Sequence, residues 1–103
     1  MAIWTIIGKG IAGEGEGKSF GITLDTDAGK WNAGGPSVAL FFNTRSGNYR
    51  IVAIPEHGMR LEGAGGAEAA FFTNLIGSTP VGATGNGRAS EKGLLFTWKL
   101  DSK

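Results

Sequence analysis

The chain has no cysteine among its 103 residues and only one histidine. Disulfide bonds and thiolate metal ligands are therefore excluded, and a zinc site would need unusual ligation by carboxylates. Proline is scarce, with three residues, and no apolar run is long enough to cross a membrane as a helix. We expect no metal, no cofactor and no membrane partner. The lack of cysteine is compatible with a reducing cytoplasm.

Neither basic nor acidic residues are in large excess. Ten basic residues stand against nine acidic ones, which gives a net charge of +1. A chain this close to neutrality lacks the bulk positive charge of a strong nucleic-acid binder. The opening residues 1–8 carry no basic segment and are apolar only briefly, so we expect no signal peptide and a cytoplasmic or virion location.

Glycine, by contrast, is abundant, with 19 residues spaced between short runs of β-branched and aromatic side chains. Without a strict triplet period, such spacing is typical of tight turns that join short strands. The length is that of one compact domain. We therefore predict one all-β domain over residues 1–103, a small antiparallel β-barrel or β-sandwich with glycine-rich loops.

Period-2 alternation locates about six strands. Phe20, Ile22 and Leu24 alternate with small or polar residues, and Phe96 and Trp98 do so near the end of the chain. The predicted strands are residues 3–8 or 3–11, 20–25, 38–44, 49–54, 58–62 and 94–100. Residues 45–48 are predicted to be a hairpin loop, and residues 62–66 and 77–93 to be longer loops.

One segment is ambiguous. Residues 67–76 combine alanines, which favour a short helix, with a Phe-Phe-Thr run, which favours extended chain. We prefer a strand there and keep the short helix as the alternative.

Two short motifs and one histidine suggest chemistry, but both motifs fail on spacing and the histidine has no partner. Residues 13–19 end in the Gly-Lys-Ser of a phosphate-binding loop, but the pattern requires a glycine where Ala12 stands. Residues 25–30 begin like a calcium loop, yet Pro36 occupies the position of the closing glutamate. His57 has no partner that would orient it for catalysis. We interpret all three as turns, and we expect no catalytic residue and no enzyme.

Five residues are the candidate contact set: Lys30, Trp31, Arg45, Tyr49 and Arg50. Trp31 is flanked by residues typical of loops, and an exposed tryptophan there would anchor an interface. Tyr49, beside Arg50 and close to Arg45, could stack a base and neutralise phosphate. The alternative is a packed Trp31 that covers one end of the barrel and an ordinary cross-strand Tyr49.

Balanced charge, small loop residues and the absence of catalytic motifs favour a non-enzymatic structural or assembly module. A viral (phage) capsid decoration protein is one such module, with self-association or a protein partner. The alternative is a single-stranded nucleic-acid-binding protein with an oligonucleotide-binding type of barrel, for which the five residues would form the groove. A small lectin is a third hypothesis, and it lacks repeated sugar-site motifs.

Overall fold

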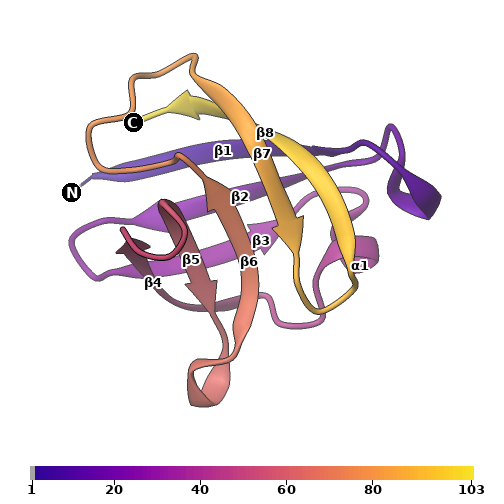
Figure 1. Cartoon of the computed structure of the whole chain (residues 1–103), viewed down its shortest axis with the longest axis horizontal. Coiled ribbons are helices and arrows are strands. Elements are labelled where there is room, and N and C mark those ends of the chain that lie inside the picture. Colours follow the sequence, from indigo (N-terminus) through magenta and orange to yellow (C-terminus); the bar gives the residue numbers. More distant parts are fainter. Residues whose placement is uncertain (1) are drawn as a thin grey trace.

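A computed structural model describes residues 2–103 and shows a closed barrel of antiparallel strands (Figure 1). Each strand pairs with the next one along the chain, and β8 closes the barrel against β1. The strands are β1 (Ile3–Gly10), β2 (Ser19–Asp25), β3 (Lys30–Gly34), β4 (Ser46–Val52), β5 (Gly58–Glu62), β6 (Glu68–Thr73), β7 (Thr84–Ala89) and β8 (Leu94–Ser102). The predicted all-β class and antiparallel barrel are confirmed, with eight strands instead of about six.

The alternating segments lie where the sequence predicts strands. Phe20, Ile22 and Leu24 of β2 point into the barrel, as do Phe96 and Trp98 of β8, and all five are almost completely buried. Burial of one face of each strand against the others is the main stabilising contribution of such a barrel. The segment at 67–76 is also a strand, β6, so the short helix considered there is not formed.

Two strands, β3 and β7, lie in segments that we expected to be loops. The inward positions of β7 include Gly85 and Gly87, so the strand has little apolar signal of its own. A Cβ atom at Gly85 would lie 2.7 Å from the Trp98 ring, and one at Gly87 would lie 2.4 Å from the Phe96 ring. Aromatic rings from β8 therefore occupy the space that β7 side chains would fill.

Residues 38–44 are a correction. We expected a strand, but α1 (Val38–Phe41) is a single helical turn followed by a short extended segment. Val38, Phe41 and Phe42 are buried and Ala39 is exposed, which is helical spacing. The predicted hairpin loop at 45–48 is wrong too, because β4 begins at Ser46 and pairs there with β3.

Aromatic side chains fill the barrel and close it at the α1 end. The centroid of the Phe41 ring in α1 lies 4.7 Å from that of the Phe20 ring, and the Phe20 and Phe96 ring centroids are 5.0 Å apart. At the opposite end, where Figure 1 places both termini, Leu75 is completely buried beside the end of β6. A small barrel filled in this way offers its outer surface and loops for binding.

Candidate functional site

The structure does not gather the five predicted contact residues into one groove. Trp31 is on β3 and its side chain is completely buried. Its indole Nε1 donates a hydrogen bond to the carbonyl oxygen of Glu62 at 2.9 Å. Of the two interpretations of Trp31, the packed one is observed, so the indole is part of the core and is not an exposed contact residue.

The other members of the set are spread over the strands that follow. Tyr49 is half-buried and packs against the core. Burial, together with the negative charges of Asp25 and Asp27, raises the pKa of the Tyr49 hydroxyl. The Lys30 ammonium group donates to Asn48 Oδ1 at 2.6 Å, so it is turned along the sheet.

Arg45 and Arg50 also have partners. The Arg45 Nε atom donates to the carbonyl oxygen of Phe42 at 3.3 Å. Arg50 forms an ion pair with Glu62 at 2.9 Å. Neither arginine is paired with a neighbouring exposed aromatic ring, since all ten aromatic residues lie among residues 2–103 and none is exposed.

A band of alternating charges crosses the outer face of β4 to β7. Its members are hydrogen-bonded to one another, and we call them the arginine–glutamate cluster: Arg50, Glu56, Arg60, Glu62, Glu68 and Arg88. Three positive and three negative charges cancel within it. The cluster therefore leaves little net charge on this side of the barrel.

Phe71 lies beneath the cluster on the outside of the barrel. The Arg88 guanidinium carbon is 4.8 Å from the centre of its ring, a cation–π contact. Arg88 also donates from Nε to Glu68 at 2.8 Å and from Nη2 to Glu56 at 2.8 Å. The guanidinium group covers the ring and keeps Phe71 out of water, although the ring faces outward.

The cluster lowers the pKa values of its carboxyl groups. Hydrogen bonds from Arg50 and then Arg60 hold the pKa of Glu62 below its usual range. Burial of Glu68 raises the pKa of its carboxyl group, but hydrogen bonds from Arg88 and Ser90 outweigh burial, so that pKa is also lowered. The ionised forms are thus favoured in the folded protein.

We expect acid to weaken the fold through this cluster. The lowered pKa values mean that its stabilisation is present above the ordinary glutamate pKa of 4.5 and is lost as the pH falls through the folded-state values. Urea unfolding at about pH 7 and about pH 3 measures the loss. Glu68→Gln should reduce the pH dependence, whereas Glu14→Gln, outside the cluster, should leave it unchanged. An equal response of both variants would contradict this role.

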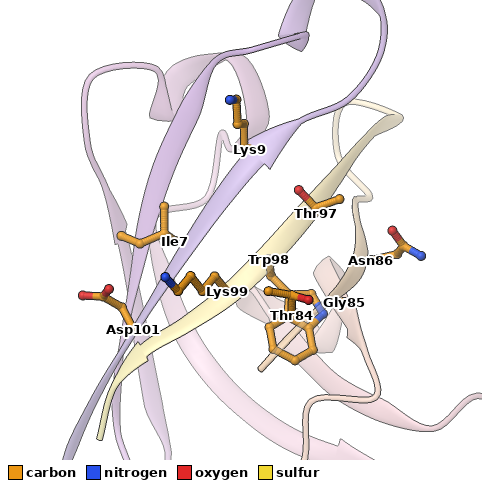
Figure 2. Close-up of a pocket in the computed structure, with 9 residues that line it drawn as sticks. All are labelled: Ile7, Lys9, Thr84, Gly85, Asn86, Thr97, Trp98, Lys99 and Asp101. Carbon is orange, nitrogen blue, oxygen red and sulfur yellow. The ribbon is translucent and has the colours of Figure 1, made fainter. Parts of the chain in front are cut away.

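On the other side of the barrel, a groove of about 800 Å³ runs over the outer face of β7, β8 and β1 (Figure 2). We call it the β7–β8–β1 groove. Its surface is mostly apolar, with Lys9, Lys99 and Asp101 as its ionised groups. The lining comprises Ile7, Lys9, Thr84, Gly85, Asn86, Thr97, Trp98, Lys99 and Asp101. In the strand register Lys9 is opposite Thr97, and Ile7 is opposite Lys99. Both ammonium groups therefore belong to one face of the sheet.

Aliphatic side chains extend this surface toward the α1 end. Ile7, Ile11 and Leu95 are 40%, 46% and 53% exposed. The amide of Ile11 donates to the carbonyl oxygen of Leu95 at 3.2 Å, so these two residues are neighbours across β1 and β8. Exposed aliphatic residues next to a groove are a feature of surfaces that bind other proteins.

No family model, no curated protein and no solved structure matches this chain. Among residues 2–103 no helix has the length and hydropathy needed to cross a membrane. The function has to be inferred from the surface itself.

The motifs singled out in the sequence are turns. Residues 13–15 form one 3-10 turn instead of the start of a helix that could cradle phosphate. Asp25 Oδ1 accepts the amide hydrogens of Asp27 and Ala28, each at 3.1 Å, which confirms that it caps a turn. His57 is exposed in the loop between β4 and β5.

Sequence analysis missed the groove because it missed β7. The outward positions Thr97 and Lys99 are visible in the alternation of the last strand. The neighbouring strand, β7, was expected to be a loop, and its Thr84 and Asn86 form the other wall of the groove. The alternation of polar residues with Gly85 and Gly87 was the signal that could have located it.

Proposed function

We propose that this protein is a non-enzymatic assembly module that binds protein through the outer face of β8 and β1. One observation carries the proposal. The barrel is filled by its own aromatic residues, while Ile11 and Leu95 are exposed beside each other on that face and Ile7 is exposed further along β1. Exposed aliphatic residues that lie together beside a groove are a feature of surfaces that another protein covers, whereas a single one such as Ile54 is ordinary.

The finer part of the proposal is a structural role in a repetitive shell, such as decoration of a viral (phage) capsid, with the protein located in the virion or the cytoplasm. Balanced surface charge and closed, filled packing suit a small unit that is used many times. A protein partner or self-association fits the aliphatic surface better than a small ligand does.

Single-stranded nucleic-acid binding is the alternative predicted from the sequence. Such binding relies on exposed aromatic rings on which bases stack. Trp31 is completely buried, and Tyr49 packs against the core. The alternative therefore has less support than assembly does.

We expect the tagged protein to sediment with a large assembly in the cells or particles that contain it. Leu95→Asp should return it to the slowly sedimenting fraction, because a buried unpaired carboxylate opposes docking. Ile54→Asp is the matched control, since Ile54 is 86% exposed and lies in the loop at the opposite end of the barrel. Sedimentation of wild type as the free chain, or of the Leu95→Asp variant with the assembly, would contradict the proposal.

A further inference from the structure

Charged side chains that pair with one another and charged side chains that make no such pair lie on different sides of the barrel. On β4 to β7 the arginine–glutamate cluster pairs its charges internally. The ionised side chains that make no hydrogen bond or ion pair within residues 2–103 all belong to β1, β8 or the loops beside them: Lys9, Glu14, Glu16, Lys18, Lys92, Lys99 and Asp101. The side that carries Ile7, Ile11 and Leu95 thus also carries these unpaired charges.

Two of the unpaired cations, Lys9 and Lys99, line the β7–β8–β1 groove. They are diagonal neighbours on adjacent strands, a relation that places backbone positions about 7–8 Å apart. Figure 2 shows that the Lys9 ammonium group points away from Lys99, whereas the Lys99 ammonium group points toward Ile7 and Asp101. The groove carries two ammonium groups and one carboxylate, that of Asp101, and its net positive charge favours an occupant that presents carboxylates.

The chain itself presents two exposed carboxylates in one loop. Glu14 and Glu16 are exposed in the loop that follows β1. This loop is anchored, because the amide of Gly17 donates to the carbonyl oxygen of Gly10 at 3.0 Å and Gly15 is buried against the Phe41 ring. The carboxylates are therefore presented on a fixed support, which reduces the entropy lost on binding.

We propose that the occupant of the groove is a second copy of this chain, with Glu14 and Glu16 of each copy against Lys9 and Lys99 of the other. The loop follows β1, whose Lys9 lines the groove, so Glu14 is only five residues along the chain from that groove. A two-fold axis then satisfies both contacts at once, as an isologous interface requires. Ile7 on one side of Lys9, and Ile11 and Leu95 on its other side, would be buried in the same interface. This inference rests on the proposed function and names its partner.

Charge reversal tests the pairing. The wild type should have a solution mass of twice the 10.7 kDa chain and should dissociate as salt is raised. Lys9→Glu with Lys99→Glu, and separately Glu14→Lys with Glu16→Lys, should each be monomeric, because loop and groove then carry like charges. A one-to-one mixture of these two double variants should dimerise again, since both contacts become complementary. The control, Lys30→Glu with Arg45→Glu, should stay dimeric.

Three results would overturn the inference: a monomeric wild type at every concentration, double variants that remain dimeric, or a mixture that remains monomeric. A labelled single-stranded oligonucleotide that binds wild type and not the Lys9→Glu, Lys99→Glu variant would assign the groove to nucleic acid instead. Failure of the dimer inference can be distinguished from failure of the proposed assembly function. If only the dimer inference fails, the purified chain is monomeric, yet Leu95→Asp still removes it from the native assembly.

Discussion

Phe96→Ala should lower the free energy of unfolding by about 3–5 kcal/mol, the usual cost of removing a buried phenylalanine ring. Phe96 is completely buried at the centre of the aromatic core, with ring centroids 5.0 Å from Phe20 and 5.1 Å from Phe72. Its ring also fills the space above Gly87, where no side chain can close the cavity. Urea unfolding followed by tryptophan fluorescence measures the change.

The control for this variant is the preceding residue of the same strand. Leu95 points outward and is 53% exposed, so Leu95→Ala in dilute solution should change stability by no more than about 0.5 kcal/mol. Equal losses for Phe96→Ala and Leu95→Ala would mean that the inward and outward faces of β8 are wrongly assigned.

Gly47→Ala should be the second strongly destabilising change, at about 2–4 kcal/mol from overpacking and a disturbed indole hydrogen bond. A Cβ atom at Gly47 would lie 1.9 Å from the carbonyl oxygen of Glu62 and 3.0 Å from Trp31 Nε1. The first contact is with backbone, so β4 and β5 would have to separate. That movement would strain the bond from the indole to the same carbonyl oxygen.

Gly21→Ala is the matched control for Gly47→Ala. Gly21 is also inside a strand, but a Cβ atom there would have no neighbour within 4 Å. Its replacement should be neutral or stabilising by up to about 1 kcal/mol, because alanine restricts the unfolded chain. Thermal unfolding of both variants decides the matter, and a larger loss for Gly21→Ala would refute the packing described for β4.

The fold class follows from local pattern, and the number of strands does not. Alternation along β2 and β8 is strong because inward positions hold Phe20, Leu24, Phe96 and Trp98. In β7 the corresponding positions hold glycine, and the rings that cover them come from β8. A strand whose core contacts are supplied by its neighbour has no apolar period of its own.

Exposure of single residues was harder to predict for the same reason. Trp31 is flanked by Lys30 and Asn32, which gave it the appearance of a loop residue. Both neighbours are outward positions of β3, and the indole between them is inward. The groove likewise depends on β7, β8 and β1 lying side by side, which the closure of the barrel brings about and local sequence does not show.

The most direct measurement of the central claim uses the absence of cysteine, which makes single-cysteine variants easy to interpret. Asn86→Cys places a thiol in the β7–β8–β1 groove, and Ser46→Cys places one on the exposed outer face of β4. In the purified chain, kept monomeric by high salt, both should react with a thiol reagent. In the native assembly we predict that Asn86→Cys is protected and Ser46→Cys still reacts. Equal labelling of the two, or protection of Ser46→Cys alone, would contradict assembly through this face.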